Sequence, residues 1–384
     1  MRAAPELAIN GFVPVVASAS FDATSVHLRQ RCAPLDRATA MAVAVARQAA
    51  ADAGAGIGLA SQRTGIYWGT GMGAANTLED SYRSVFQDHN WRLKPTSIVT
   101  GMTNAPASLI SLECGVTGPA LTYSVACASS AVAIGEAMRA IRHGVVDCAV
   151  AGGSEALLTR GVLAAWVALR TLARTDGADA SRSCKPFASD RSGFALGEGA
   201  AAIILESSER AARRGARIHA ELAGFGMTSD ATHIADPSSD GQARALEAAL
   251  ADAGARPSEV GYVNAHGTAT VIGDGVEVES IKRIFGKEAS RIPVSSTKAL
   301  HGHMMGAAGA IEFMIAVLAM NSGSLPPTAH LAVPDPALDL DFVPNTARHD
   351  LALSAVVSNS FAFGGSNAVL VARKVGPRLY FSNA

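Results

Sequence analysis

The segment formed by residues 120–150 places a cysteine between a predicted strand and a predicted buried helix. Residues 120–125 form an apolar strand, and the helix predicted for residues 129–142 is apolar nearly all round, so both are expected inside the protein. Gly144 ends this helix, and residues 145–150 predict a second buried strand. A chain that contains such a strand-helix-strand unit is expected to fold into packed α/β layers.

The cysteine of this unit, Cys127, lies where the strand meets the helix. A helix N-terminus leaves backbone N–H groups without partners and carries a partial positive charge, and both effects favour a thiolate over a thiol. Since the thiolate is the nucleophilic form of cysteine, Cys127 is a candidate nucleophile. The alternative is a small core residue, because free cysteines are among the most buried residue types.

Further strand-like runs alternate with helical patterns along the chain. Strands are expected at residues 63–69, 200–205, 218–226, 260–265, 292–296, 352–359 and 368–372, and helices at residues 35–53, 206–215, 241–254, 274–285 and 307–320. This alternation predicts α/β layers with largely parallel sheets. Residues 124–131 and 295–310 each lead from a strand into a buried helix, which fits either an internal repeat or two unrelated βα units.

The composition excludes several classes of function. The chain has 384 residues, of which 49% are hydrophobic, so it can bury one large core or two fused cores. Its net charge is -1 and no long basic or acidic run occurs, which argues against binding to nucleic acid or to an anionic membrane surface. No apolar run reaches about 18 residues without a charge or a helix breaker, so no membrane span is expected. The N-terminal residues lack the pattern of a signal peptide.

Cysteine usage indicates the compartment. The five cysteines are Cys32, Cys114, Cys127, Cys148 and Cys184. Their number is odd and none of them forms a CxxC pair, so structural zinc is not expected. The pattern favours a protein of the reducing cytoplasm.

The first histidine motif is Asn-Ala-His-Gly-Thr-Ala-Thr at residues 264–270, where an apolar strand delivers His266 into a loop. Thr268 and Thr270 add hydroxyl groups at alternate positions, an arrangement that suits a polar ligand chain passing along the loop. A single histidine after a strand is more often a structural residue, so this motif alone leaves both interpretations open.

The second histidine motif covers residues 295–306 and places His301 and His303 two positions apart. A buried Lys298 in this motif would need a carboxylate partner, and Glu312 on the following apolar helix is the natural candidate. Metal binding is the alternative for the two histidines. No third ligand cluster of suitable type accompanies them, so no metal site is expected.

The third motif is Ser-Asn-Ser-Phe-Ala-Phe-Gly-Gly-Ser-Asn at residues 358–367, between two apolar strands. Its two glycines allow the backbone to approach a ligand closely, and Phe361 and Phe363 offer an apolar face for a substrate. The alternative is a hairpin turn packed by two phenylalanines.

Together the motifs resemble the signatures of the elongating β-ketoacyl-acyl-carrier-protein synthases, the condensing enzymes of fatty acid and polyketide synthesis. The resemblance rests on Ala-Cys-Ala-Ser-Ser around Cys127, on the two histidine motifs, on the third motif and on residues 182–199. It implies an α/β fold of the thiolase type, with two pseudo-duplicated halves in a five-layer α-β-α-β-α sandwich. We place the half with the nucleophile at residues 1–210 and the half with the histidines at residues 211–384.

The resemblance also implies the partners. Substrates would be carried on the phosphopantetheine of an acyl carrier protein, and no other cofactor is expected. The chain would form a homodimer, or a heterodimer with a chain-length-factor-like subunit.

The same resemblance implies roles for the core of the site. Cys127 would take the growing acyl chain as a thioester, and malonyl-carrier protein would lose carbon dioxide to give the carbanion that attacks this thioester. His266 and His303 match the two catalytic histidines, which assist decarboxylation and stabilise the enolate oxygen. Lys298 and Glu312 match a supporting ion pair, which we expect to organise the second histidine.

Further residues match the substrate channel of the family. The backbone N–H groups of Cys127 and Phe363 match the oxyanion hole, and Phe363 matches the phenylalanine that gates acyl entry. Thr268 and Thr270 match residues that hold the phosphopantetheine arm.

Four departures from the family pattern stand out. Ala362 replaces the usual glycine of the gating loop, His301 stands where threonine is common, and Val125 replaces the usual threonine before Ala-Cys. The region before residue 35 is shorter than usual, with its first strand expected at residues 6–12. The trimming resembles that of short synthases of aryl-polyene pathways, and Ala362 predicts a gating loop that moves less than in glycine-bearing relatives.

Three related classes fit less well. A thiolase needs a second cysteine near the C-terminus, and no cysteine follows Cys184. Starter-unit synthases pair cysteine and histidine with asparagine, whereas His303 stands at that position. A chain-length factor, which is a non-catalytic subunit, usually lacks the cysteine that Cys127 provides.

Overall fold

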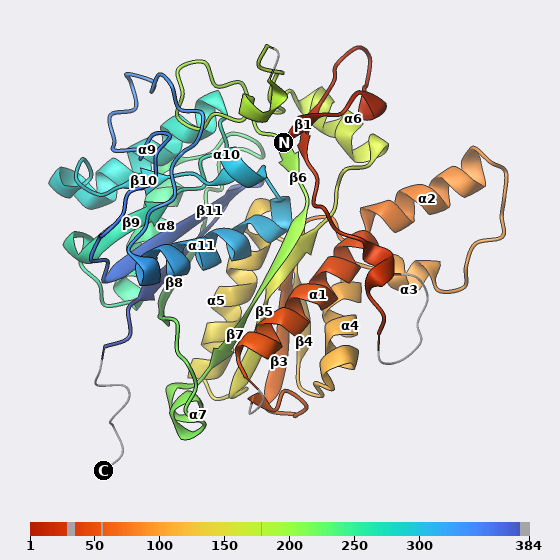
Figure 1. Ribbon diagram of the computed structural model, residues 1–384, viewed down its shortest axis with the longest axis horizontal. Coiled ribbons are helices and arrows are strands. Elements are labelled where there is room, and N and C mark those ends of the chain that lie inside the picture. The colour runs from red at the N-terminus through yellow and green to blue at the C-terminus, as the bar shows by residue number, and fades with distance from the viewer. Residues whose placement is uncertain (29–34, 55–56, 178, 377–384) are drawn as a thin grey trace.

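The computed structural model describes residues 1–28, 35–54, 57–177 and 179–376 (Figure 1), so Cys32 lies outside the described residues. The first half contains the strands β1 (Arg2–Ala3), β2 (Val15–Ala17), β3 (Thr64–Gly69), β4 (Ala120–Tyr123), β5 (Cys148–Glu155), β6 (Leu196–Gly197) and β7 (Gly199–Glu206). Its helices are α1 (Arg37–Asp52), α2 (Ala75–Phe86), α3 (Ser97–Gly101), α4 (Ala105–Cys114), α5 (Ser129–Arg142), α6 (Arg160–Leu169) and α7 (Ser208–Arg213).

The second half follows a similar order. Its strands are β8 (Glu221–Ser229), β9 (Val260–Asn264), β10 (Val294–Ser295), β11 (Ala355–Ala362) and β12 (Ser366–Arg373). Its helices are α8 (Ser239–Asp252), α9 (Val271–Phe285), α10 (Lys298–His301) and α11 (Ala308–Ser322). Helix α7 connects β7 to β8, and the predicted division after residue 210 falls within it; the division itself stays a prediction.

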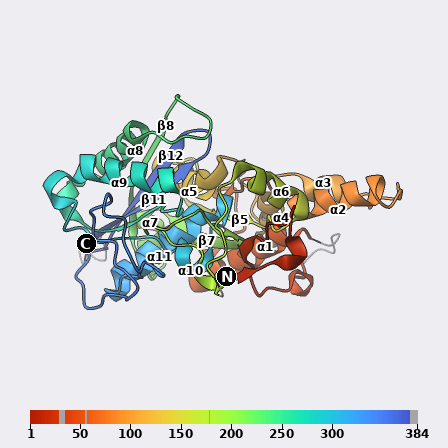
Figure 2. The same ribbon diagram turned by 90° about the horizontal axis from the view of Figure 1, so that it is seen from above.

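Two main sheets form the second and fourth layers of the molecule (Figures 1 and 2). One sheet has the strand order β4-β3-β5-β7, and the other has the order β10-β9-β11-β12-β8. Helices α5 and α11 pack against each other between the sheets, α1 and α4 cover the outer face of the first sheet, and α8 and α9 cover that of the second. The molecule is therefore the five-layer α-β-α-β-α sandwich that we predicted.

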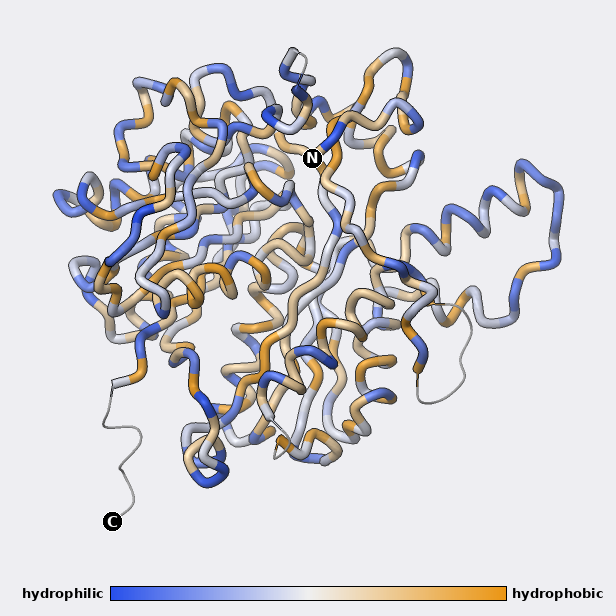
Figure 3. Tube along the Cα trace, in the orientation of Figure 1, coloured by the Kyte–Doolittle hydropathy of each residue, from blue (hydrophilic) through white to orange (hydrophobic). Residues whose placement is uncertain are grey.

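The central helices are apolar on all sides because both of their faces are covered. Helix α5 begins and ends at the predicted residues, Ser129 and Arg142. The segment Met305–Ser322, which contains α11, is long and apolar enough by composition to cross a membrane, which we did not expect from the sequence. Of this segment 67% is buried, so its apolar character matches its position in the core. In Figure 3 these central elements carry mostly hydrophobic residues, whereas the connector α7 carries hydrophilic ones.

Most strands of the two main sheets run the same way, as predicted, and β7 and β12 are the two that run opposite to the others. Strand β3 runs parallel to β4 and β5, and β9 runs parallel to β10 and β11. Strand β7 is antiparallel to β5, and β12 is antiparallel to both β11 and β8. The tight turn between β11 and β12 allows only an antiparallel pair, whereas parallel neighbours need a crossover such as α5.

The prediction of an N-terminal strand at residues 6–12 is wrong. Strands β1 and β2 pair antiparallel and extend to β6 in a small third sheet, and residues 6–12 lie between them. Asn10 and Gly11 have φ angles of 48° and 81° and join Ile9 to Phe12 in a tight turn. An Asn-Gly pair is the strongest short signal for such a turn, and it interrupts the apolar run that suggested a strand.

The internal repeat is visible in the backbone. A 3₁₀ turn, Ala126–Ala128, leads into α5, and a second one, Met305–Ala307, leads into α11. The first residue of each turn, Ala126 and Met305, has the same unusual φ of 43°. The two turns contact each other, so the N-terminal ends of α5 and α11 face one another at the centre of the molecule, as the repeat predicted.

Candidate active site

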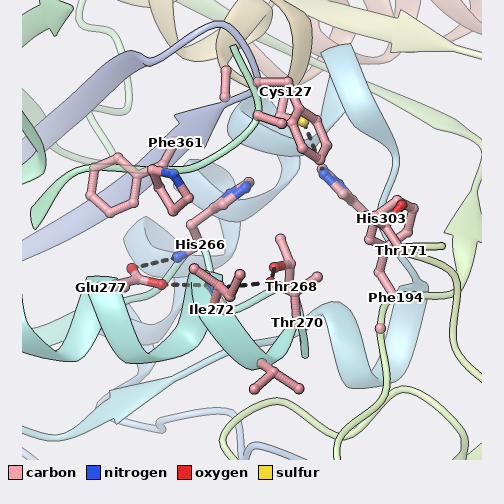
Figure 4. A pocket seen from close by; sticks show the side chains of 18 of the residues that line it. Cys127, Thr171, Phe194, His266, Thr268, Thr270, Ile272, Glu277, His303 and Phe361 are labelled. Carbon is pink, nitrogen blue, oxygen red and sulfur yellow. Dashed lines mark hydrogen bonds between the residues drawn. The ribbon is translucent and has the colours of Figure 1, made fainter. Parts of the chain in front are cut away.

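A cavity of about 420 Å³ opens where the N-terminal ends of α5 and α11 meet. Every predicted catalytic residue that carries a thiol or an imidazole lines it, together with the predicted substrate contacts: Cys127, His266, His303, Thr268, Thr270, Phe361 and Phe363. Figure 4 shows His266 and His303 pointing toward the sulfur of Cys127 from different elements. The structure therefore brings these sequence-predicted residues together.

The backbone around Cys127 is fixed and strained. Cys127 is the middle residue of the turn before α5, and the φ of 43° at Ala126 is unusual for a residue with a Cβ. The Ser129 hydroxyl accepts a hydrogen bond from the Val125 N–H (2.8 Å) and donates one to the Ala126 carbonyl (2.7 Å). This turn places the thiol at the end of α5, where Cys127 is only 2% exposed.

His303 is the direct partner of the thiol. Its Nε2 lies 3.1 Å from Cys127 Sγ, although the two residues come from opposite halves of the chain. The backbone of His303 is held on both sides, because its N–H donates to the Ala195 carbonyl and its carbonyl accepts the Gly197 N–H, each at 2.8 Å. His303 can therefore exchange a proton with Cys127 without moving.

The protonation of Cys127 differs from the sequence-based expectation. Burial raises the pKa of the thiol to about 12, while the Lys298 ammonium and the Phe363 backbone N–H act to lower it. The helix N-terminus alone therefore does not make Cys127 a thiolate at rest, because removal of water disfavours the charged form more strongly. A nearby proton acceptor is needed, and His303 is within hydrogen-bond distance of the sulfur.

Both histidines are neutral in this environment. Burial lowers the pKa of His266 well below its ordinary value, and the Lys298 ammonium adds to this effect. The same two causes, in the same order, lower the pKa of His303. The two rings lie edge to face with their centroids 5.3 Å apart, so each presents a ring nitrogen to the cavity. Neutral imidazoles can donate hydrogen bonds without carrying charge into an apolar site.

Lys298 and Glu312 form the predicted buried ion pair. Their Nζ and Oε1 atoms are 2.5 Å apart and both side chains are fully buried. Lys298 Nζ also donates to the His266 carbonyl (2.5 Å) and lies 3.3 Å from His266 Nδ1. The pair therefore holds His266, and our expectation that it organises the second histidine, His303, is wrong. Lys298 starts the short helix α10, from which its long side chain reaches the loop that follows β9.

Glu277 is a site residue that the sequence reasoning missed. Its buried carboxylate accepts the backbone N–H groups of His266 (2.8 Å) and Gly267 (2.7 Å), and Asn359 Nδ2 donates to it at 3.0 Å. It fixes the loop that carries His266 from the side opposite Lys298. A signal was present, because Asp274 and Glu277 are three residues apart and share one face of α9, which is otherwise largely apolar there.

The two threonines lie at the cavity wall but interact with each other. Their Oγ1 atoms are 3.0 Å apart, and Thr270 Oγ1 also accepts the Gly273 N–H at 3.2 Å, which caps the N-terminus of α9. Thr268 is the more available of the two for a ligand. Their role in holding a substrate arm stays a prediction.

The hairpin motif brings Phe361 and Phe363 to different sides of the site. Phe361 is buried, with its ring centroid 6.1 Å from that of His266. The ring of Phe363 packs at 5.8 Å against Trp166 of α6, which the sequence reasoning also missed. The hairpin alternative is correct as a description of the backbone, and it coexists with the predicted placement of both side chains at the cavity.

Ala362 is unstrained in this conformation. It is the last residue of β11 and pairs with Ser366, so its backbone is extended. The positive φ angles of the turn, 86° and 75°, belong to Gly364 and Gly365. A gating loop that moves less because of Ala362 stays a prediction.

His301 does not reach the cavity. Its Nε2 lies 3.0 Å from Thr297 Oγ1 and its Nδ1 lies 2.8 Å from the Gly302 carbonyl, and burial lowers its pKa to about 4. The two histidines of this motif therefore do not form a joint metal site.

Cys127, His266 and His303 are the one trio with metal-ligand geometry found in the described part of the chain, since their donor atoms all lie within 4.8 Å of one another. The Lys298 ammonium beside His266 would repel a cation there. We expect no metal at this trio, which stays a prediction.

Comparisons with known proteins identify the family of this chain. The family model "Beta-ketoacyl synthase, N-terminal domain" matches residues 6–211, and "Beta-ketoacyl synthase, C-terminal domain" matches residues 219–332. The chain therefore belongs to the β-ketoacyl synthase family, and it is a condensing enzyme of the acyltransferase class.

Individual relatives are similar over most of their length. Nodulation protein E of Rhizobium leguminosarum bv. trifolii is 44% identical over 315 residues, which cover 82% of this chain and 76% of that protein. The 3-oxoacyl-[acyl-carrier-protein] synthase 2 of Staphylococcus aureus (strain COL) is 40% identical over 316 residues, with the same coverage of 82% and 76%. The solved structure of the ishigamide ketosynthase/chain length factor superimposes with a TM-score of 0.86 at 32% identity, covering 93% of this chain and 87% of that one.

The buried ion pair predicts a large stability effect. Changing Lys298 to Met leaves the Glu312 carboxylate buried without its cation, so we expect a loss of about 3–5 kcal/mol in the free energy of unfolding. Urea titration followed by circular dichroism measures this loss. Lys282→Met is the matched control, because the Lys282 side chain is 38% exposed in its pair with Asp339, and we expect a loss below about 1 kcal/mol.

The double variant Lys298→Met with Glu312→Leu separates charge from packing. It removes both charges, so most of the lost stability should return. Equal losses in Lys298→Met and Lys282→Met would contradict a buried pair.

Proposed function

We propose that this chain catalyses the decarboxylative condensation of malonyl-acyl carrier protein with an acyl group held on Cys127, and that the product is a β-ketoacyl-acyl carrier protein. The observation that carries the proposal is the convergence of one thiol and two neutral imidazoles, from both halves of the chain, within 4.8 Å. A thiol accepts an acyl group readily, and a covalent intermediate divides the condensation into two easier steps.

In the first step Cys127 acquires the acyl group. His303 Nε2 takes the proton of Sγ, and the sulfur attacks the thioester carbonyl of the incoming acyl-carrier. The carrier thiolate leaves and receives the proton from His303, so the imidazole returns to its neutral form. The backbone N–H groups of Cys127 and Phe363 stabilise the negative oxygen of the tetrahedral intermediate, a role supported by the hydrogen bond from the Phe363 N–H toward the sulfur.

In the second step malonyl-carrier enters the emptied cavity. Loss of carbon dioxide leaves an enolate on the carrier thioester, and the neutral His266 and His303 donate hydrogen bonds to its oxygen. For this the His303 ring carries its proton on Nε2, the tautomer opposite to the one that accepts the Cys127 proton in the first step. The enolate carbon attacks the acyl thioester, and Cys127 leaves as a thiolate that takes up a proton from solvent. Burial keeps both imidazoles neutral and the charge of Lys298 adds to this effect, while Glu277 and Glu312 fix the elements that hold them.

The substrates of this reaction arrive on phosphopantetheine arms. The cavity opens past Thr268 and Thr270 and past the backbone of α9, and this polar wall suits the amide groups of the arm. The acyl chain meets the apolar cluster around Cys127, which includes Phe194, Leu196 and Met305. We place the reaction in the cytoplasm, where carrier-bound thioesters and free thiols coexist, and we expect no cofactor beyond the carrier.

A second subunit is expected at the edge strand β4. Its outer edge has no partner strand among the described residues, and Leu121 in it is 45% exposed. Helices α2 and α3 form an arm that projects from the body of the molecule in both views (Figures 1 and 2). The arm and its loop expose several large apolar side chains: Tyr82, Phe86, Trp91, Ile98 and Val99. An open edge strand and an exposed apolar arm in the same half of the chain fit a second copy of this chain or a chain-length-factor-like subunit.

Acylation tests the nucleophile. Incubation with an acyl-carrier thioester should add one acyl mass to the protein, and Cys127→Ala should abolish the addition, as measured by intact mass spectrometry. Cys148→Ala is the control, because Cys148 is buried in the core of the first sheet and should not change the result. An acyl adduct that persists in Cys127→Ala would contradict the assignment.

The two histidines should differ in the acylation step. Changing either His266 or His303 to Ala should reduce condensation by roughly 10²-fold or more, because each loses a hydrogen bond to the enolate. Acylation should be slowed more by His303→Ala, since only its imidazole contacts the sulfur. His301→Ala is the control with an unchanged condensation rate. Normal condensation in both variants would show that the enolate is stabilised elsewhere.

The edge strand predicts association. We expect the purified chain to be a dimer by light scattering, and Leu121→Lys to raise the dissociation constant on the order of tenfold or more. Val145→Lys, at a site that is 54% exposed and lies outside the sheet, is the control. A wild-type chain that stays monomeric by itself would exclude the homodimer and favour a chain-length-factor-like partner.

A further inference from the structure

Glu155, the last residue of β5, is a buried carboxylate that the mechanism does not use. It is fully buried, and its partners in the described chain are N–H groups and one hydroxyl, with no cation among them. Oε2 accepts the N–H groups of Gly71 (2.5 Å) and Gly306 (2.9 Å). Oε1 accepts the N–H group of Met72 and the Thr70 hydroxyl, both at 3.2 Å. The carboxylate therefore joins three segments that are far apart in the sequence.

The backbone is built closely around this carboxylate. A Cβ at Gly306 would lie 2.6 Å from Glu155 Oε2 and 2.3 Å from the Gly71 nitrogen. A Cβ at Gly71 would lie 2.8 Å from the same oxygen. All three distances are shorter than a real Cβ tolerates, so only glycine allows the two N–H groups to reach Glu155 together.

The internal repeat relates the contact between Glu155 and Gly306 to the site of Cys127. Gly306 is the middle residue of the turn before α11, as Cys127 is the middle residue of the turn before α5. Strand β11 ends beside the Cys127 turn, where Phe363 donates its N–H toward the sulfur, and β5 ends beside the Gly306 turn, where Glu155 accepts an N–H. The second half thus repeats the backbone of the nucleophile site, with a fixed carboxylate in place of a substrate.

We propose that Glu155 is a positioning residue, which fixes the turn at residues 305–307 against the loop at residues 70–72 and thereby keeps His303 and Met305 beside Cys127. Met305 Sδ lies 3.9 Å from Cys127 Sγ, and the turn begins two residues after His303 in the chain. Glu155 acts through the backbone and does not touch the substrate. The inference rests on the proposed function only in taking Cys127 as the nucleophile.

Glutamine cannot replace this carboxylate. Both oxygens accept hydrogen bonds, so in either orientation a glutamine would turn its NH₂ group toward backbone N–H groups. Glu155→Gln keeps the volume of the side chain, but the turn that follows His303 loses its anchor. Glu206→Gln is the matched control. Glu206 is a largely buried carboxylate at the far end of the same sheet, where its partners are Arg210 and Arg214.

The test measures Cys127 directly and needs no carrier. The full-length variants are treated with chloroacetamide well below their melting temperatures, and the rate of Cys127 alkylation is followed by peptide mass spectrometry. We expect Glu155→Gln to lower this rate by roughly ten- to a hundredfold, because small displacements of a reacting pair are costly, while Glu206→Gln leaves it unchanged. In the condensation assay the same variant should lower kcat and leave the KM of the carrier substrate unchanged.

A residue that only stabilises the fold would lower the melting temperature without changing the alkylation rate of the folded protein, and that result would overturn the proposal. Should Glu155→Gln fail to fold, Thr70→Val removes one hydrogen bond to the carboxylate, and Thr70→Ser restores the hydroxyl. We expect slower alkylation in Thr70→Val only. Because alkylation needs no acyl substrate, a chain that proves inactive in condensation would still show whether Glu155 positions the site.

Discussion

The close approach of α5 and α11 in the central layer is the constraint on which the site depends. A Cβ at Gly309 would lie 2.8 Å from the Cβ of Ala131, so the helices meet at a distance that only small residues allow. The Ala310 N–H also donates to the Ser130 hydroxyl at 2.9 Å, which fixes the register of the two helices. Since each helix begins at one edge of the cavity, this contact brings a thiol from one half to an imidazole from the other.

Burial and a single buried ammonium together set the charge state of the cavity. Burial lowers the pKa of both His266 and His303, and the positive charge of Lys298 lowers both further because it disfavours a second positive charge. The same charge favours a negative sulfur, so it lowers the pKa of Cys127 against the opposing effect of burial. Lys298 is stable there because Glu312 pairs with it, and the opposite charges of the two leave the cavity without a strong net charge.

Local pattern was enough to predict most of the elements and the residues that meet at the cavity. The apolar run after Cys127 predicted both ends of α5 correctly. A buried apolar segment of this length must pair its own backbone groups, and a helix does so. The reversed direction of β7 and β12 and the histidine that Lys298 contacts depend on tertiary packing, so the local pattern did not give them. Glu155 could not be found in this way, because a single acidic residue in a sequence does not reveal which backbone N–H groups will surround it, whereas Glu277 left a signal in its spacing from Asp274.

The two halves share the backbone conformation of the turns before α5 and α11, but only the first half can carry a thiol in its turn. Both turns that precede the central helices begin with a residue at a φ of 43°, and the middle residue of each points toward the end of a strand from the other half. At Cys127 the facing strand end leaves the cavity open. At Gly306 the Gly71 nitrogen would lie 2.3 Å from any Cβ, so no second cysteine fits the equivalent position. Of the two equivalent turn positions, that of Cys127 is therefore the one that can carry a thiol.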